Sequence, residues 1–484
     1  MSRDSHLPGL LSGGDCHYVI PREGPMLVPG RIFGHPDILR EQLGSKALQQ
    51  VKNVACLPGI IEASMAMPDI HEGYGFPIGG VAAMDFSRGV ITPGGIGYDI
   101  NCGVRIMVTQ LNREEIDGKI EALVDSLFRR IPAGVGREGP IKLNRRQIDE
   151  VFTKGAAWAV EQGYGYQEDL LRCEENGAIE GADPSAVSER AFQRGRGELG
   201  TLGSGNHFVE VGYVERIYDQ PAASAYGLWP DQVVIWVHSG SRGLGHQVCS
   251  DYIGVMRRAA QKYGTVQPDR QLDSAPITSP EGQKYYSAMA AASNYAWANR
   301  QILSHYAREA VGEVLGKRAC RLGLNLIYDV AHNIGKIEEH TIDGVRRRVL
   351  VHRKGATRAF GPGSMGIPDE YRAVGQPVLV PGDMGRASWV LAGTESPSAL
   401  SFCSACHGAG RAMSRRSAKQ TVSVDALKRN LLSMGVVVRS TTVKGLVEEA
   451  PSAYKDVDYV VDSTVRAGLG RKVARLRPLG VIKG

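Results

Sequence analysis

Four histidines of this chain stand in sequence settings that suit chemistry more than packing. His207, His238, His332 and His407 each follow an apolar or small stretch and open into small, polar or glycine-rich sequence. An imidazole that a strand end delivers into a loop without bulky neighbours can reach a metal ion or a phosphate, whereas a histidine on a helix face usually packs. The four histidines are therefore candidate metal ligands or nucleophiles.

Asp99 and Cys102 add an oxygen and a sulfur ligand to this set. They stand three residues apart in a glycine-flanked loop, so both side chains can converge on one ion, and a thiolate can also bridge two ions. Together with the imidazoles of His207, His238 and His332, they form a mixed set that suits Mn, Fe, Co or Zn better than Mg or Ca. Asp-x-x-Cys alone is a weak signal, since a single cysteine in such a place is more often a small core residue.

His407 differs from the other three because it precedes a loop with little side-chain bulk. Backbone N–H groups of Gly408, Ala409 and Gly410 can face phosphate oxygens, and Arg411 supplies positive charge. An imidazole beside bound phosphate is placed to act as a nucleophile. The alternative is a structural histidine that caps a turn, and the motif taken alone favours that alternative.

Standard nucleotide motifs are missing from the sequence, which has neither a P-loop nor a dinucleotide fingerprint nor the kinase set. Any nucleotide must therefore be held by other loops, and the candidates are residues 206–210, 332–333, 381–384, Ser388 and the tail 480–484. A lysine in such a tail is ordinarily solvated, but the apolar pair before Lys483 can anchor it. The Cys-x-x-Cys of Cys403 and Cys406 has no second copy and is interpreted as incidental packing of two thiols.

Composition bounds the class of protein. The chain has 484 residues, 43% hydrophobic and 22% charged, and its net charge of +6 permits a polyanionic partner without requiring one. Because no apolar run is long enough to span a bilayer, a cytoplasmic protein without a membrane partner is expected. The eight cysteines are scattered, which predicts free thiols rather than a disulfide framework.

The pattern of apolar residues predicts the elements that must position these groups. Residues 65–108 predict short strands joined by tight loops, and residues 233–237 and 324–330 predict strands that each lead into a histidine. Apolar spacing from Ile116 to Ile131, with Asn112 as cap, predicts a helix. A long alanine-rich helix is predicted from about Pro280 to Val314, and residues 133–200 predict helical segments with loops.

No repeat, low-complexity tract or linker separates the candidate motifs. We therefore predict one large intertwined domain over residues 1–484, of mixed α/β class, with a central β core surrounded by helices.

Several long segments resemble one known family. Together they closely resemble the RtcB family of RNA-splicing ligases, in order and over nearly the whole chain: residues 67–80, 97–105, 203–208, 237–242, 331–333, 406–411 and 483–484. The resemblance implies an RtcB-like fold and a GTP- and manganese-dependent ligase. Such an enzyme joins an RNA 3′-phosphate or 2′,3′-cyclic phosphate to a 5′-hydroxyl, in tRNA splicing or RNA repair.

The resemblance also implies a role for each motif. Asp99, Cys102 and His207 would hold one Mn²⁺, and Cys102, His238 and His332 the second. His407 would attack the α-phosphate of GTP to form a covalent guanylate, with Asp69 near the reactive centre. The implied nucleotide contacts are Asn206, His207, Phe208, Val209, Glu210, His332, Asn333, Pro381, Gly382, Asp383, Met384, Ser388, His407, Gly408, Ala409, Gly410 and Lys483.

The chain departs from the family pattern at four places. The family would have Gly and Thr at Cys403 and Ala405, and small or hydroxyl residues at Asp383 and Arg386. These departures bear on nucleotide positioning or rate more than on the type of reaction. They leave the metal-ligand set intact.

Two other functions use part of the same pattern. A dinuclear metal-dependent phosphoesterase would need the Asp, Cys and His set but no covalent nucleotide on His407. An RNA-binding scaffold would use the basic clusters and leave the metal ligands without a purpose. The physiological RNA, the need for an activator of the archease type and the oligomeric state stay open at this point.

Overall fold

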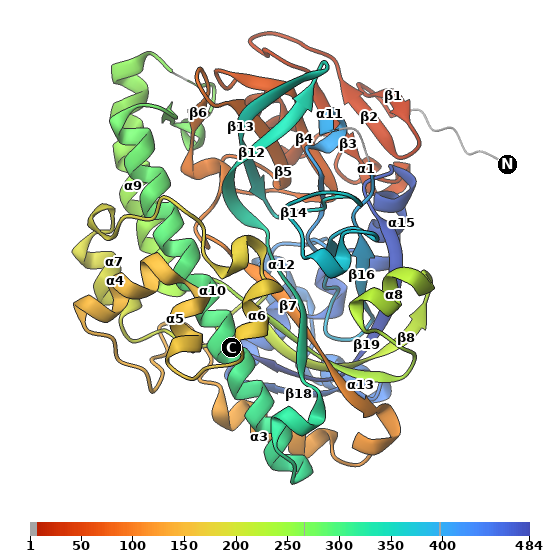
Figure 1. Ribbon diagram of the computed structural model, residues 1–484. Helices are drawn as coiled ribbons and strands as arrows, with labels where there is room; N and C mark the ends of the chain where they lie inside the picture. The colour runs from red at the N-terminus through yellow and green to blue at the C-terminus, as the bar shows by residue number, and fades with distance from the viewer. Residues whose placement is uncertain (1–6, 266, 396–397) are drawn as a thin grey trace, which may run out of the picture.

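The computed structural model describes residues 7–265, 267–395 and 398–484. Two large sheets dominate it, and within the described residues one has seven strands and the other eight. In Figure 1 most of the first sheet occupies the upper part of the view, the second sheet lies below it, and the helices α9 (Arg242–Tyr263) and α10 (Pro280–Leu315) run along one side. The mixed α/β class predicted from the sequence is confirmed.

The first sheet is formed mainly by the N-terminal part of the chain. Its strands, in spatial order, are β1 (Leu11–Gly14), β2 (His17–Ile20), β3 (Gly30–Phe33), β4 (Ile60–His71), β5 (Ile78–Asp85), β13 (Val345–Lys354) and β12 (Asn333–Ile342). Neighbouring strands are antiparallel except β3 and β4. The predicted short strands of residues 65–108 are present, although β4 is longer than predicted, with 12 residues.

The second sheet gathers strands from the whole length of the chain. Its order is β11 (Asn325–Ala331), β7 (Gly103–Asn112), β9 (Gln232–Ser239), β8 (Phe208–Ile217), β19 (Arg471–Lys483), β16 (Ser388–Ala392) and β15 (Pro377–Val380), and β18 (Val437–Ser440) also pairs with β19. The two strands predicted to lead into histidines are β9 and β11. Both are confirmed.

Two small ribbons complete the β structure. They pair β6 (Val90–Ile91) with β10 (Ala275–Pro276), and β14 (Ala356–Arg358) with β17 (Ser404–Cys406). The remaining helices are α1 (Pro36–Arg40), α2 (Lys46–Val54), α3 (Ile120–Arg130), α4 (Arg145–Lys154), α5 (Ala156–Glu161), α6 (Gln167–Leu171), α7 (Glu189–Gly195), α8 (Gln220–Tyr226), α11 (Ser398–Ser401), α12 (Arg415–Thr421), α13 (Val424–Ser433), α14 (Val443–Glu448) and α15 (Val457–Arg466). None of the helices in the described ranges combines the length and apolarity that crossing a bilayer requires.

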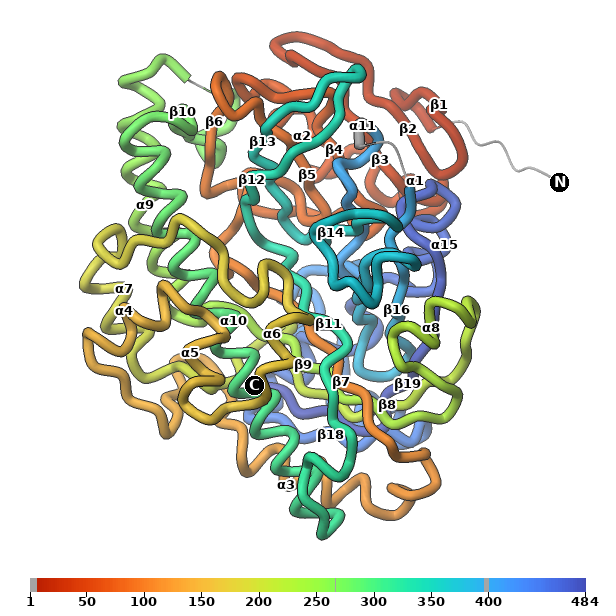
Figure 2. The backbone as a smooth tube through the Cα atoms, in the orientation of Figure 1, coloured from red at the N-terminus to blue at the C-terminus, as the bar shows by residue number. Residues whose placement is uncertain are grey.

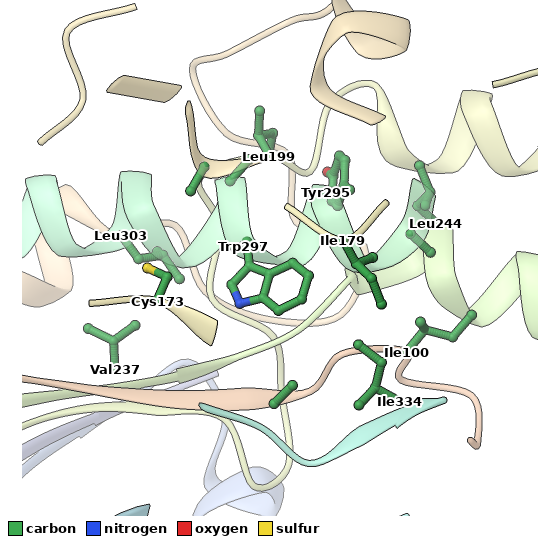
Figure 3. Close-up of a cluster of buried hydrophobic side chains, with 14 of the residues drawn as sticks. Ile100, Cys173, Ile179, Leu199, Val237, Leu244, Tyr295, Trp297, Leu303 and Ile334 are labelled. Carbon is green, nitrogen blue, oxygen red and sulfur yellow. The ribbon is translucent and has the colours of Figure 1, made fainter. Parts of the chain in front are cut away.

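Helix α10 begins where its sequence predicts. Pro280 occupies the first turn, and the Ser279 hydroxyl accepts a hydrogen bond from the Gly282 N–H at 3.1 Å. Its alanines are fully buried and let neighbouring elements approach closely. Figure 3 shows Trp297 directed from this helix toward the strands, among Val237, Cys173 and Ile334.

The helix predicted from Ile116 to Ile131 begins later than predicted. The capping box of Asn112 and Glu115 closes only a 3-10 turn over Arg113–Ile116, and α3 starts at Ile120. Gly118, with a φ of +72°, separates the two elements because this backbone conformation cannot continue a right-handed helix.

Helix α15, from the C-terminal part of the sequence, packs against the N-terminal part of the chain. Figure 2 shows α15 beside the N-terminal strands. Two contacts hold it there: the Arg466 guanidinium pairs with Asp15 at 2.6 Å, and the backbone N–H of His35 donates to the Ser463 hydroxyl at 2.9 Å. The eight cysteines are free thiols, as the sequence predicted.

Candidate functional site

Neighbouring strands of the second sheet deliver the predicted metal ligands to one edge. β7 begins directly after Cys102 and lies between β9 and β11, with Gly103 opposite Ser239 on one side and Ala331 on the other. His238, the next-to-last residue of β9, therefore lies beside Cys102, and His332 follows β11 on the other side of β7. β8 pairs with β9 through Phe208 and His238, so His207 stands at the same edge.

The ligand atoms of these side chains converge on the sulfur of Cys102. Its Sγ lies 3.4 Å from Nε2 of His207 and 3.2 Å from Nε2 of His238. Nε2 of His238 faces Nε2 of His332 at 3.3 Å, and Nε2 of His207 lies 2.8 Å from a carboxylate oxygen of Asp99. The result is two overlapping triads, Asp99–Cys102–His207 and Cys102–His238–His332, within each of which the ligand atoms lie within 4.8 Å of one another.

This donor set fits transition-metal cations. Nitrogen and sulfur ligands lie about 3.3–3.8 Å apart when each is roughly 2.0–2.3 Å from one tetrahedral ion. Burial holds the pKa values of His238 and His332 well below the ordinary value, so both imidazoles are neutral. Two neutral imidazoles with facing Nε2 atoms can share only one proton, whereas a cation accepts a lone pair from each.

The sulfur also suits a cation. Burial, with the Asp99 carboxylate second, raises the pKa of Cys102 well above its usual value. A bound cation reverses this effect, because a coordinated thiol loses its proton.

A buried ion network behind the sheet holds the ligand loop in place. The Arg300 guanidinium on α10 donates to the backbone carbonyls of Asn101 and Ser239 and to the carboxylate of Asp329. Asp329 also accepts from Arg105 at 2.7 Å, and these side chains are fully buried. Helix α10 thus holds Asn101, the residue before Cys102, and Ser239, on the neighbouring strand, in fixed positions. The network persists because charges removed from water are costly unless they are paired.

His407 follows β17 and is held by a buried carboxylate. One oxygen of Asp69 lies 2.5 Å from Nδ1 of His407 and also accepts from its backbone N–H at 3.0 Å. A carboxylate only accepts, so the proton resides on Nδ1 and Nε2 keeps its lone pair. The ring centre of His407 lies 4.9 Å from that of His332, which places the predicted nucleophile beside the metal ligands.

Gly410, in the loop after His407, allows this loop to lie against Asp69. Gly410 has a φ of +72°, and a Cβ there would lie 2.3 Å from the backbone oxygen of Asp69. Only glycine lets the loop pass this close to β4.

One cavity of about 870 Å³ joins these groups. His407 and the ligands Asp99, Cys102, His238 and His332 line it, while Asp69 is buried behind His407. The residues predicted for the nucleotide that also line it are Asn206, Phe208, Glu210, Asn333, Pro381, Gly382, Asp383, Met384, Ser388, Gly408, Ala409, Gly410 and Lys483. Two of the predicted residues lie elsewhere: His207 is buried beside Cys102, and Val209 belongs to the hydrophobic core.

Lys483 is an ordered part of the cavity wall. It ends β19, and its ammonium group donates to the backbone carbonyl of Gly205 at 3.2 Å and lies 3.4 Å from the carboxylate of Glu449. Burial lowers the pKa of Lys483, while Glu449 opposes that shift. Arg411 also pairs with Glu449, at 3.1 Å.

The unusual residues Asp383 and Arg386 form an ion pair with each other at 3.2 Å. Asp383 also accepts the backbone N–H groups of Gly385 and Arg386, which closes the loop before β16. Burial and then Asp383 raise the pKa of Glu210, on the same wall, to about 8. The two residues of this loop that depart from the family pattern, Asp383 and Arg386, therefore contact each other.

Some lining residues carried no recognisable signal in the sequence. Glu449 and Tyr454 lie on a segment without a motif, and only the fold brings them to Lys483 and Arg411. His71 stands inside the motif of residues 67–80, where its position two residues after Asp69 was the available signal.

Comparison with known proteins supports a single family. The family described as tRNA-splicing ligase RtcB matches residues 50–484. A tRNA-splicing ligase RtcB of Thermococcus kodakarensis is 53% identical over 459 residues, covering 95% of each chain, and one of Archaeoglobus fulgidus is 54% identical, covering 92% of each. An RNA-splicing ligase RtcB of Mycobacterium tuberculosis is 52% identical over 90% of this chain and 100% of its own. With a family match over residues 50–484 and relatives at half identity or more over nearly full length, the chain belongs to the RtcB family.

Proposed function

We propose that this protein is an RNA ligase that joins RNA 3′-phosphate or 2′,3′-cyclic phosphate ends to 5′-hydroxyl ends, in tRNA splicing or RNA repair. The names of its relatives support ligation in splicing. One observation carries the mechanism: Asp69 presents the free Nε2 of His407 in the same cavity as two triads of metal ligands. A dinuclear phosphoesterase that activates water on its metal ions does not need such a nucleophile.

The proposed metal ions are two Mn²⁺. Asp99, Cys102 and His207 would hold one, and Cys102, His238 and His332 the other. When bound, such ions neutralise the charge that develops on phosphate oxygens.

The proposed nucleotide is GTP. Its phosphates would lie along the loop of Gly408, Ala409 and Gly410, where the cations Arg411 and Lys483 line the wall. The backbone N–H of Ala409 already donates to the carbonyl of Pro381, so it would not bind a phosphate. The other residues that we propose to contact it are Asn206, Phe208, Glu210, Asn333, Pro381, Gly382, Asp383, Met384 and Ser388.

In the proposed first step Nε2 of His407 bonds to the α-phosphorus, and the bond from that phosphorus to the bridging oxygen breaks, releasing pyrophosphate. Asp69 holds the proton on Nδ1 and stabilises the charge that the ring gains. An oxygen of the RNA 3′-phosphate then bonds to the α-phosphorus, and the bond from that phosphorus to Nε2 breaks, so that the guanylate passes to the RNA. Finally the 5′-hydroxyl oxygen bonds to the phosphorus of the RNA 3′-phosphate, GMP leaves, and the hydroxyl proton passes to solvent.

Guanylate transfer to the protein tests the proposal. Wild-type protein incubated with Mn²⁺ and α-labelled GTP is expected to keep label after denaturation, and the bond should be acid-labile and alkali-stable, as a phosphoramidate is. His407→Ala should lose the label, while His305→Ala, an imidazole on the outer part of α10, should keep it.

Unlabelled wild-type protein, or label that survives in His407→Ala, would overturn the proposal. Phosphoester cleavage by an unlabelled wild type would instead identify the dinuclear phosphoesterase that the ligand set alone permits. The partners we propose are RNA with such ends and an activator of the archease type, and the proposed compartment is the cytoplasm.

A further inference from the structure

The cavity has a second wall, opposite in character to the nucleotide wall. It is built from the segment between α1 and α2 and from the turn after β4. The residues on it are Glu41, Gln42, Ser45, Lys46, His71, Glu72, Gly73 and Tyr74. Gln50 ties this wall together by donating to the Gly73 carbonyl at 2.7 Å and accepting from the Gly73 N–H at 3.1 Å.

The ring of His71 has a defined orientation on this wall. Its Nδ1 lies 2.8 Å from the backbone carbonyl of Asp69, the residue whose carboxylate orients His407. A carbonyl oxygen only accepts, so Nδ1 carries the proton and Nε2 is an acceptor. Within the described residues Nε2 has no protein partner, and the side chain lines the cavity.

His71 also stays neutral. Burial, followed by the positive charge of Lys455, lowers the pKa of His71 to about 3. The Lys455 ammonium donates to the backbone carbonyl of Ile70, the residue before His71. At neutral pH the ring therefore offers a lone pair and no positive charge.

The charges of the second wall do not suit a phosphate. Lys46, the one cation among its described lining residues, is paired with Glu72 at 2.9 Å, and Glu41 adds another carboxylate. The nucleotide wall differs, because three cations, Arg411, Arg415 and Lys483, share the single carboxylate of Glu449 there. An RNA end that carries a hydrogen-bond donor and no charge therefore fits the second wall, and a phosphate fits the nucleotide wall.

We infer that Nε2 of His71 accepts a hydrogen bond from the 5′-hydroxyl of the incoming RNA strand, so that His71 is a specificity-determining residue for that end. This inference rests on the proposed ligase function. Asp69 then orients two imidazoles at once: its carboxylate holds the nucleophile for the nucleotide, and its backbone carbonyl holds the acceptor for the hydroxyl.

The test measures how much the 5′-hydroxyl contributes to binding of the RNA strand, with and without the imidazole ring of His71. With saturating GTP, Mn²⁺ and a 3′-phosphate strand, one measures KM for a 5′-hydroxyl strand and the inhibition constant of the same strand with a 5′-deoxy terminus. In the wild type the 5′-deoxy strand should bind about tenfold more weakly, as expected for the loss of one hydrogen bond. In His71→Ala this difference should shrink to less than about twofold.

His71→Gln serves as the conservative variant, because its amide oxygen can reach the place of Nε2 and should restore part of the difference. His305→Ala is the matched control and should behave as the wild type does. Labelling of each variant with α-labelled GTP reports whether its cavity is intact.

An unchanged tenfold difference in His71→Ala would overturn the inference. Failure of both His71 variants to take up label would overturn it as well, because the ring would then be structural. An unlabelled wild type would instead refute the proposed function itself.

Discussion

The sulfur of Cys102 is the one atom that both ligand triads share. Replacing it removes one of three protein ligands from each triad at once, and a serine hydroxyl is a much poorer ligand for a transition metal than a thiolate. In Cys102→Ser, manganese retained after desalting should fall from two ions to less than one per chain. Metal analysis by mass spectrometry measures this.

Cys320→Ser is the control, because Cys320 is exposed and belongs to neither triad. Retention of two ions by Cys102→Ser would show that the ligand set lies elsewhere.

At the scale of residues, the sequence predicted the candidate metal ligands better than the residues that support the cavity. His207, His238, His332 and Cys102 were identifiable from residue type and setting, and the structure brings their ligand atoms together. Glu449 could not be identified in this way. Its role follows from a contact with Lys483, which only the pairing of β19 with β8 creates.

At the scale of elements, an ion network connects the first sheet to β17, the strand that precedes His407. Glu338 of β12 pairs with His340 at 2.8 Å and with Arg353 of β13, and Arg353 donates to the Ser404 hydroxyl at 2.8 Å and to the Phe402 carbonyl. Burial disfavours the charge on His340, but hydrogen bonds to Cys403 and Glu338 and the charge of Glu338 outweigh it and raise the pKa to about 9.

This shift predicts a stability that depends on pH. Because the folded pKa of His340 is raised above 6.5, its contribution is fully present below pH 6.5 and is lost as the pH rises through about 9. The difference in unfolding free energy between wild type and His340→Gln should therefore shrink by an amount on the order of 2 kcal/mol from pH 6.5 to pH 9.5. Urea unfolding at both pH values measures it, and a difference that does not change with pH would contradict the prediction.

The elements themselves were predictable where local signals agreed. Ser279, Pro280 and the alanines that follow all favour helix, and α10 begins at Pro280. The start of α3 was predicted wrongly because the capping box at Asn112 was assigned to the wrong turn, and Gly118 was the overlooked break. The strand order of the second sheet was beyond sequence patterns, since its neighbours are distant in the chain.

At the scale of the whole molecule, stability depends on the buried network that joins α10 to the second sheet. Asp329 is the shared counter-charge of Arg105 and Arg300, and all three are fully buried. Asp329→Asn leaves two guanidinium groups without a carboxylate, so the free energy of unfolding should fall by about 3–5 kcal/mol. Chemical denaturation measures the loss.

Glu150→Gln provides the matched comparison, because it breaks the exposed pair with Arg146 and should cost less than about 1 kcal/mol. Equal losses in the two variants would show that the buried network does not stabilise the fold. The prediction that one domain spans residues 1–484 stays a prediction.

The contact between Asp69 and His407 joins positions 338 residues apart. At a synthesis rate of roughly 5–20 residues per second, a ribosome needs about 20–70 s to add that length of chain. During this interval the nascent polypeptide already carries the carboxylate but has no imidazole for it to orient. The proposed transfer of a guanylate to His407 therefore cannot begin until most of the chain has been translated.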